Sequence, residues 1–283
     1  TEDQQKRPVT GVMIENSPEA RPQSGLTEAG VVFEAIAEGG ITRFLAIFQE
    51  SEPKHIGPVR SARPYYVDWI QGFDAGLSHA GGSADALIKI RKEGVKDIDH
   101  SRNGSTYQRV SGRYSPHNLY TSMAKLDQVN SSKGWTSSKF TSFPRKKEAA
   151  SKVPTASTVN FGISSFLYNP QFVYDIGSSS YKRSQAGKPH TDEKSGNQIN
   201  PKVVIAMIMG HRVYNGVNTA YDNIGSGKCF VFQDGTVTTG TWKKDSSKTQ
   251  VSFTDDSGKE IALNPGQTWL SAVGKATAVT YTP

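Results

Sequence analysis

One stretch of the chain, residues 57–83, gathers residue types that suit the binding of an anion. In order along the stretch, these residues are Arg60, Arg63, Pro64, Gly81, Gly82 and Ser83. A guanidinium suits phosphate because it donates paired hydrogen bonds in a fixed fork and stays charged at any working pH. A glycine turn that leads into a helix adds free backbone N–H groups and partial positive charge. The spacing therefore predicts an anion-binding cleft, with the arginines on one side and the glycine turn on the other.

Two helices and one strand are expected to position this cleft. Proline is favoured at the first helical position, so a helix is predicted to begin at Pro64. Its apolar face, spaced i, i+3, i+4 and i+7, consists of Tyr66, Trp69, Ile70 and Phe73. Residues 75–80 are typical of a buried strand that ends near His79, and Ser83 is a good N-cap for a helix over residues 84–92. The structural alternative is that the glycines only turn the chain and the arginines only pair with carboxylates.

Charged residues also lie on two strand-like runs that precede the stretch, residues 31–37 and 42–49. Alternation places Glu34 on a face with apolar residues, which is unusual for a charge without a partner. Pairing of Glu34 or Glu38 with Arg43 across this hairpin is one interpretation. The alternative is that these side chains project into the cleft, and we predict that Arg43 joins the two arginines there.

Further residues are candidates for chemistry in the cleft. Those for proton transfer or metal binding are Glu38, Asp68 and His79, because they are nearest in sequence to the arginines. Asp68 follows Pro64 by about one helical turn and could reach back toward Arg63 or a cation. An imidazole titrates in the useful pH range, although a histidine at a buried strand end is more often structural. The remaining predicted ligand contacts are Arg21, Tyr65, His117 and Asn118, and a helix-entry turn is the alternative explanation of the last two.

A divalent cation could bind near residues 95–100, where Asp97 and Asp99 share one face of a strand beside His100. A solvated strand end explains the same pattern, so no metal ligands are assigned and the cofactor is left unknown. The sequence holds no G-x-S-x-G, no P-loop and no H-E-x-x-H. Cys229, the single cysteine, lies in an apolar run and is expected to be buried, which excludes an internal disulfide and disfavours a thiol nucleophile. Whether the protein catalyses a reaction is left open.

The chain is expected to fold as two domains behind a short tether. Residues 1–10 form the tether, residues 11–145 an α/β domain with a mixed sheet and helices, residues 146–156 a linker, and residues 157–283 a β-rich domain. Ser, Lys and Pro dominate around the linker, and beyond it the apolar residues alternate as they do in strands.

The second domain is predicted to consist of short strands and polar loops. The strands are expected at residues 157–162, 172–176, 203–209, 229–233, 236–242, 250–254, 261–263 and 278–281. Asp234-Gly235 is a strong signal for a hairpin turn. Residues 178–200 are expected to form a polar loop with His190 and Asp192 on the surface.

Charge and hydropathy restrict the partners. The net charge of +7 favours acidic surfaces such as anionic lipid heads, teichoic-acid-like polymers or nucleic acid. Nucleic acid is the weakest of these, because the basic residues are scattered and no aromatic-basic platform of a known module is present. No run of about 18 apolar residues exists, so no membrane-spanning segment is expected.

Six motifs spread over nearly the whole chain carry a resemblance to a known family. They are ENSPEARPQSGL, GGITRFLAIFQ, GPVRSARPYY, HAGGS, SPHNLYTS and NPGQTWLSAV. Together they resemble the YerB-like bacterial lipoproteins, a family of unknown function. The resemblance implies secretion, lipid attachment through a cysteine outside this sequence, and a place on the outer face of a Gram-positive plasma membrane. It implies no reaction.

The first half is also similar, in the order of its features, to the LytR–CpsA–Psr phosphotransferases. Those enzymes transfer a cell-wall polymer with the help of arginines and a magnesium-binding aspartate. The analogy gives Arg43, Arg60 and Arg63 a phosphate-clamping role. The pattern departs from that family at Pro64, because no aspartate directly follows the second arginine.

We therefore expect an extracytoplasmic, membrane-anchored lipoprotein of the cell envelope. Its first domain is predicted to bind a phosphorylated or otherwise anionic ligand, with phosphotransferase activity as the finer hypothesis. A non-catalytic scaffold that recruits a protein partner through the β-rich domain is the alternative. Binding of nucleic acid is the third and weakest hypothesis.

Overall fold

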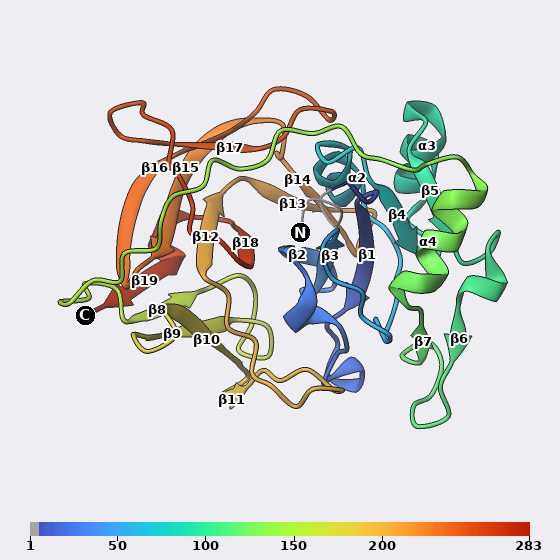
Figure 1. Cartoon of the computed structure of the whole chain (residues 1–283), viewed down its shortest axis with the longest axis horizontal. Coiled ribbons are helices and arrows are strands. Elements are labelled where there is room, and N and C mark those ends of the chain that lie inside the picture. Colours follow the sequence, from blue (N-terminus) through green and yellow to red (C-terminus); the bar gives the residue numbers. More distant parts are fainter. Residues whose placement is uncertain (1–5) are drawn as a thin grey trace.

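One large mixed sheet runs through the computed structural model, which describes residues 6–283 (Figure 1). The first half of the predicted tether thus lies outside the described residues. In sheet order the strands are β17 (Ser252–Asp255), β16 (Thr236–Lys244), β15 (Gly225–Gln233), β12 (Val203–Ile208), β18 (Thr268–Val273), β2 (Val31–Glu38), β3 (Ile41–Phe48), β1 (Thr10–Glu15), β4 (Gly76–His79) and β5 (Lys96–Asp99). A hairpin of β13 (His211–Tyr214) and β14 (Asn218–Tyr221) joins the sheet beside β2.

The two halves of the chain share this sheet. Strand β18 from the second half pairs in parallel with β2 from the first, from Thr268 opposite Val31 to Ser271 opposite Glu34. The predicted strand-rich second half and the mixed sheet are confirmed. The first half is less helical than an α/β domain would be, because its described residues hold only three α-helices, α2 (Pro64–Gln71), α3 (Ala84–Glu93) and α4 (Met123–Ser132).

The helices begin where local chemistry favours it. Pro64 stands at the start of α2, and Ser122 caps α4 by accepting a hydrogen bond from the Lys125 N–H at 3.4 Å. Ser83 occupies the N-cap position of α3, but its side chain makes no capping hydrogen bond. Helix α3 ends at Gly94, whose positive φ of 66° suits glycine. The short 3-10 helices are η1 (Pro18–Ala20), η2 (Leu26–Glu28), η3 (Gly104–Thr106) and η4 (Ala276–Ala278).

Helix α2 covers one face of the large sheet. Trp69 stacks on Phe33 of β2 with ring centroids 5.0 Å apart, and Tyr66 donates a hydrogen bond to the Arg43 carbonyl at 2.7 Å. Every residue of α2 between its two ends is buried, and burying one large apolar side chain contributes about 1.5–3 kcal/mol. The apolar periodicity predicted for this helix therefore describes the face that fixes it to the sheet.

A second sheet covers the opposite face. Its order is β11 (Lys188–Pro189), β10 (Ser180–Gln185), β9 (Pro170–Asp175), β8 (Thr158–Phe161) and β19 (Val279–Thr282), while β6 (Gln108–Arg109) and β7 (Leu119–Tyr120) form a separate pair. The predicted surface loop over residues 178–200 is therefore wrong. It contains β10 and β11, and His190 and Asp192 are buried. The predicted strand over residues 261–263 is also wrong, since Leu263 makes only an isolated bridge with Arg145.

A buried ion pair joins the two sheets. Arg183 of β10 donates hydrogen bonds at 2.9 and 3.1 Å to both carboxylate oxygens of Glu34, and both side chains are fully buried. Trp269 donates to the same carboxylate at 2.9 Å, and its ring lies 4.8 Å from the Arg183 guanidinium. Glu34 thus has a partner, as its position on an apolar face required, but that partner is Arg183 and not Arg43.

Limited proteolysis is expected to cut the chain first between Ser131 and Pro154 and to leave the two fragments associated. Residues 137–144 lie in neither a helix nor a strand, whereas the β2–β18 pairing holds the halves together. Size-exclusion chromatography of the nicked protein should give one peak that contains both fragments. Separate fragments would contradict the shared sheet, and resistance of residues 131–154 would count against a domain boundary there.

Candidate functional site

The carboxyl ends of three parallel strands define the edge of the sheet where the site lies. Strands β1, β4 and β5 are parallel neighbours and end at Glu15, His79 and Asp99. Open sheets bind ligands in the crevice outside the carboxyl ends of such strands. Strand β3 runs the other way, so its beginning lies at the same edge, with Arg43 opposite Glu15.

A group of charged side chains gathers at this edge, and we name it the strand-end cluster. Its members are Glu15, Ser17, Glu38, Arg43, Arg60, Arg63 and His117. They come from β1 and the loop after it, the β2–β3 hairpin, the segment before α2 and the turn before β7. Arg43, Arg60 and Arg63 therefore lie together at this edge of the sheet.

Arg43 and Arg63 share one carboxylate. Both form ion pairs with Glu38, both are buried, and each retains a buried Nε atom without a hydrogen-bond partner. The pKa of Arg43 is lowered to about 10, first by desolvation and then by the positive charges of Arg63 and Arg60, while Glu38 opposes the shift. The predicted pairing of Glu38 with Arg43 is confirmed, and it leaves one carboxylate for two guanidinium groups.

Arg60 has the most exposed side chain of the three arginines in the cluster. Its Nε lies 3.4 Å from Oε1 of Glu15, and 28% of its side chain is exposed. No residue within the described range 6–283 accepts a hydrogen bond from its terminal nitrogens. Glu15 itself is buried and also contacts Ser17 and His117, at 3.1 and 3.0 Å. An open guanidinium thus stands above a buried carboxylate.

The glycine turn is joined directly to the arginine segment and does not face it across a cleft. Gly82 forms a bridge with Ala62, and Gly81 accepts a hydrogen bond from the Ala62 N–H at 2.9 Å. The helix start behind the turn is occupied, however. Asp85 accepts hydrogen bonds from the Ala86 N–H and the Tyr214 hydroxyl, and these hydrogen bonds lower its pKa although desolvation acts in the opposite direction. The chain's own carboxylate therefore fills the position expected for a ligand anion.

His79 is held inside the protein by acceptors. Its Nδ1 lies 2.7 Å from the Gly81 carbonyl oxygen and its Nε2 lies 3.0 Å from Asp97, while Asp99 accepts the Gly81 N–H at 2.9 Å. The imidazole is fully buried. His79 and the two aspartates therefore brace the ends of β4 and β5.

The residues considered for a divalent cation, Asp97, Asp99 and His100, make other contacts. The described part of the chain holds no group of three or more His, Cys, Asp or Glu side chains arranged to bind a metal. Asp97 contacts His79, and Asp99 accepts a hydrogen bond from Ser101. The ring of His100 packs edge-on against the ring of Tyr107.

Asp68 does not reach Arg63, which corrects the prediction. Its carboxylate lies 2.8 Å from the Lys89 ammonium on α3 and 3.1 Å from the Asn223 amide. The position of Asp68 on helix α2 places its side chain against α3, away from the strand-end cluster. Glu38 pairs with two arginines, Asp68 with Lys89, and His79 with Asp97. Each of the three residues predicted for proton transfer therefore has a charged or hydrogen-bonded partner.

The other predicted ligand contacts hold loops in place. Arg21 donates to Asn16 at 3.1 Å and to the Leu167 carbonyl at 2.8 Å, which ties the loop after β1 to the second half. Tyr65 donates to a β2 carbonyl at 2.5 Å, and burial raises its pKa well above the ordinary value. Asn118 accepts a hydrogen bond from a neighbouring arginine at 2.7 Å.

Glu15 and Ser17 were missed by the sequence reasoning. Both belong to the motif ENSPEARPQSGL, directly after the first strand. Polar residues at the carboxyl end of a strand are a signal for a site once that strand is known to be parallel to its neighbours. The pairing of β1 with β4 could not be read from the sequence.

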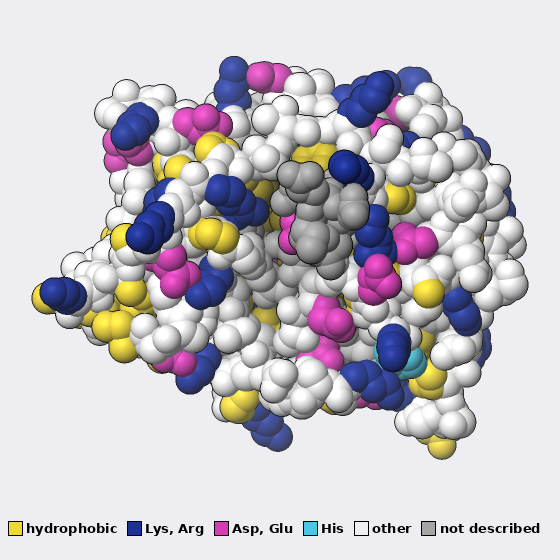
Figure 2. Space-filling view, viewed as in Figure 1, with side chains coloured by type: hydrophobic (Ala, Val, Ile, Leu, Met, Phe, Trp, Pro, Cys, Tyr) yellow, Lys and Arg dark blue, Asp and Glu magenta, His cyan; other side chains and the backbone are white. Residues whose placement is uncertain are grey.

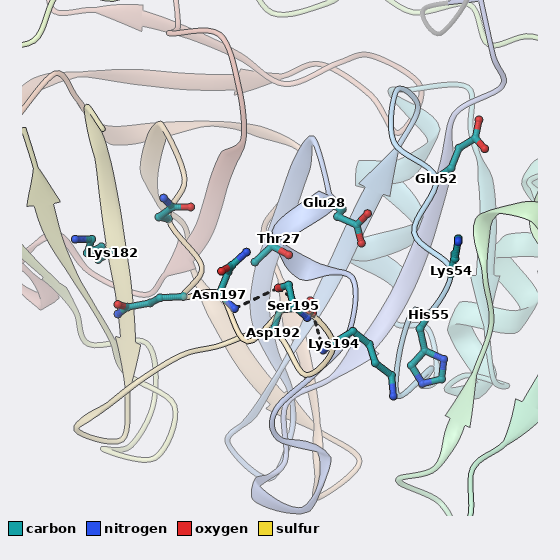
Figure 3. A pocket seen from close by; sticks show the side chains of 12 residues that line it. Thr27, Glu28, Glu52, Lys54, His55, Lys182, Asp192, Lys194, Ser195 and Asn197 are labelled. Carbon is teal, nitrogen blue, oxygen red and sulfur yellow. Dashed lines mark hydrogen bonds between the residues drawn. The ribbon is translucent and has the colours of Figure 1, made fainter. Parts of the chain in front are cut away.

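A separate groove of about 1150 Å³ lies between loops of the two halves (Figure 3). None of its lining residues belongs to the strand-end cluster. Its charges are mixed: Lys54, Lys194 and Glu28 all line it, and Lys194 extends toward His55 (Figure 3). Burial raises the pKa of Glu28, with a smaller contribution from the negative charge of Asp192.

The surface charges are also mixed. On the face drawn in Figure 2, Lys and Arg side chains are spread among Asp and Glu side chains and do not gather into one stripe. Nucleic-acid-binding domains usually concentrate basic residues on one face. This distribution gives no support to the nucleic-acid hypothesis on the face shown.

Comparisons with known protein families show to which family the chain belongs. Residues 1–136 match the N-terminal domain, and residues 158–270 the C-terminal domain, of a protein family of unknown function, DUF3048. The chain belongs to the DUF3048 family. The two matched segments of this DUF3048 protein agree with an architecture of two domains.

Individual relatives support the same assignment. "Putative lipoprotein YerB" of Bacillus subtilis (strain 168) is 33% identical over 276 residues, which is 95% of this DUF3048 chain and 82% of the relative. The crystal structure of YerB from Bacillus subtilis has a TM-score of 0.90 and 30% identity, covering 100% of this chain and 96% of the other. The predicted YerB-like resemblance is confirmed. No helix in the described part of this DUF3048 protein is long and apolar enough to cross a membrane.

Proposed function

We propose that this protein is a lipoprotein of the cell envelope that binds a phosphorylated or otherwise anionic ligand at the strand-end cluster. The observation that carries the proposal is the open guanidinium of Arg60, whose terminal nitrogens meet no acceptor among the described residues. Arginine donates to phosphate in a bidentate manner, so an anion of this kind would satisfy both terminal nitrogens.

The charge balance of the cluster supports an anion. Three guanidinium groups face two carboxylates, and the pKa of Arg43 is lowered first by desolvation and then by the positive charges of Arg63 and Arg60. Burying charges without full compensation is costly. A bound anion would offset the excess positive charge and reduce the repulsion between Arg60, Arg43 and Arg63.

Binding is better supported than phosphotransfer. The predicted proton-transfer residues Glu38, Asp68 and His79 are all engaged in structural contacts. The position of the cluster at the carboxyl ends of parallel strands suits a ligand site whether or not a reaction follows. Phosphotransferase activity therefore remains the finer hypothesis, to be tested once a ligand is known.

The scaffold alternative has one observation in its favour. Among residues 6–283, strand β13 pairs only with β14, and the hairpin exposes Val213 and Val217, at 65% and 55%. An open strand edge can accept a strand from another protein. If the scaffold alternative holds, replacing Arg60 leaves the cellular role of the protein unchanged.

An extracytoplasmic, membrane-anchored location is part of the proposal. The YerB relative is named a lipoprotein, and the motifs predict the same class. Fractionation of cells with an antibody against the full-length protein should recover it with the membrane and make it accessible from outside. A mainly soluble cytoplasmic pool would contradict this location.

Replacing Arg60 by alanine is expected to weaken the binding of inorganic phosphate or pyrophosphate by roughly 10- to 100-fold. The loss corresponds to about 1.5–3 kcal/mol for a charged hydrogen bond, at about 1.4 kcal/mol per tenfold. Folding should be kept, since the Arg60 side chain is partly exposed and its terminal nitrogens donate no hydrogen bond to a described residue. Isothermal titration calorimetry beside a melting curve measures both effects.

The matched control is Arg212→Ala, which removes one exposed guanidinium on the β13–β14 hairpin, where Arg212 pairs with Asp222. It changes the net charge equally and should leave phosphate binding unchanged. Equal losses in the two variants would show that only the overall charge matters. Unchanged binding in the Arg60 variant would assign Arg60 to a structural ion pair.

A further inference from the structure

A second open group stands beside Arg60 on the same carboxylate. The Nδ1 atom of His117 lies 3.0 Å from Oε2 of Glu15, while Arg60 approaches Oε1. The side chain of His117 is 24% exposed, whereas that of Glu15 is 5% exposed. Two partly open side chains therefore flank one buried carboxyl group.

The contacts of Glu15 fix which nitrogen of His117 carries a proton. An ionised carboxylate only accepts hydrogen bonds, so the Nδ1–H of His117 must donate to Glu15. Ser17, whose hydroxyl donates to Oε1 of Glu15 at 3.1 Å, lies 3.3 Å from the same Nδ1. Such a partner on one ring nitrogen sets the tautomer of the ring. In the neutral imidazole, Nε2 is then left with a lone pair that accepts a hydrogen bond.

No hydrogen bond within residues 6–283 occupies this Nε2 atom. The dianion of a phosphate monoester cannot donate a hydrogen bond to Nε2, because its phosphate group carries no proton. Arg60 cannot donate to Nε2 while its terminal nitrogens hold the anion. The cluster therefore offers donors for an anionic group at Arg60 and one acceptor for a neutral donor at His117.

We propose that the ligand carries a hydroxyl group a few bonds from its phosphate, as a polyol phosphate or sugar phosphate does. The phosphate contacts Arg60, and the hydroxyl donates a hydrogen bond to Nε2 of His117. This inference rests on the proposed anion-binding function and adds the class of ligand. A site built to pair with a hydroxyl discriminates against an analogue that lacks it, because the buried or partly buried partner is then left unpaired.

The test compares two phosphate esters of similar size, glycerol 3-phosphate and propyl phosphate, by calorimetric titration of the full chain. The measurement is made at pH 8. Methyl phosphate, which is a dianion at pH 8 and carries no hydroxyl, serves as a third probe that reports on the anion contact of Arg60. We expect glycerol 3-phosphate to bind about tenfold tighter than propyl phosphate, which corresponds to one hydrogen bond.

The variant His117→Phe keeps a ring of similar shape and removes both nitrogens. It should bind the two esters equally, at about the affinity of the wild type for propyl phosphate. Equal affinity of the wild-type protein for both esters overturns the inference and leaves anion binding intact. A preference for glycerol 3-phosphate that persists in His117→Phe also overturns it.

Failure of the proposed function has a different signature. In that case methyl phosphate and the two larger esters bind equally weakly to the wild type and to Arg60→Ala. If the His117 variant does not fold, as its melting curve would show, the comparison of the two esters in the wild-type protein still decides the inference.

Discussion

Replacing Glu34 by alanine is expected to lower the free energy of unfolding by about 3–5 kcal/mol, the usual cost of removing one partner of a buried ion pair. The substitution leaves the Arg183 guanidinium fully buried without its carboxylate. Trp269 loses the acceptor of its indole N–H at the same time. Since native proteins are stable by only about 5–15 kcal/mol, such a loss would bring the protein close to unfolding at ordinary temperature. Chemical denaturation monitored by tryptophan fluorescence measures the change.

Two variants act as controls for the Glu34 result. Asp222→Ala breaks an exposed pair with Arg212 and should change the stability by no more than about 1 kcal/mol. The double variant Glu34→Leu with Arg183→Met replaces both charges by apolar side chains and should recover much of the loss, because no unpaired charge remains. A small effect of Glu34→Ala alone would contradict the role of this pair in joining the sheets.

The stability of the protein is expected to fall as the pH is lowered below about 6.5, with His190 as one identifiable cause. Its pKa is lowered well below the ordinary value, first by desolvation and then by the positive charges of Arg183 and Arg21. Arg183 donates a hydrogen bond to Nδ1, and Nε2 lies 2.7 Å from Gln23. The neutral ring is therefore the form that fits this buried position.

The direction of the effect follows from which state binds the proton first. Between the ordinary pKa near 6.5 and the lower pKa of the folded protein, the unfolded chain binds a proton at His190 and the folded chain does not. His190 therefore does not reduce the free energy of unfolding above pH 6.5. Below pH 6.5, it lowers this free energy by about 1.4 kcal/mol per pH unit.

His190→Gln isolates this contribution, because glutamine can accept from Arg183 and donate to Gln23 without titrating. Denaturation curves from pH 8 to pH 5 should show a shallower decline for the variant, while the two proteins run parallel above pH 7. Equal slopes below pH 6.5 would show that His190 is protonated without cost.

Local patterns in the sequence predicted the elements around the cluster. The start of α2 at Pro64, the N-cap position of α3 at Ser83 and the hairpin at Asp234-Gly235 follow from residues within a few positions of each other. Glu38 pairs with Arg43 because both lie on one hairpin. Such short-range features are accessible to reasoning from propensity and spacing.

Long-range pairing could not be predicted in the same way. Glu34 signalled the need for a partner, but Arg183 lies 149 residues away on β10, whose sequence SYKRSQ is mostly polar and so resembled a surface loop. The contact between Glu15 and His117 likewise depends on residues 102 positions apart. Sheet order, which no local pattern encodes, decided both contacts.

A crystal soaked with inorganic phosphate or pyrophosphate shows whether the strand-end cluster binds an anion through Arg60. We expect an anion at hydrogen-bond distance, about 2.7–2.9 Å, from the terminal nitrogens of Arg60. An anion bound only in the groove beside Lys54 and Lys194, or an Arg60 side chain left with no anion, would contradict this expectation.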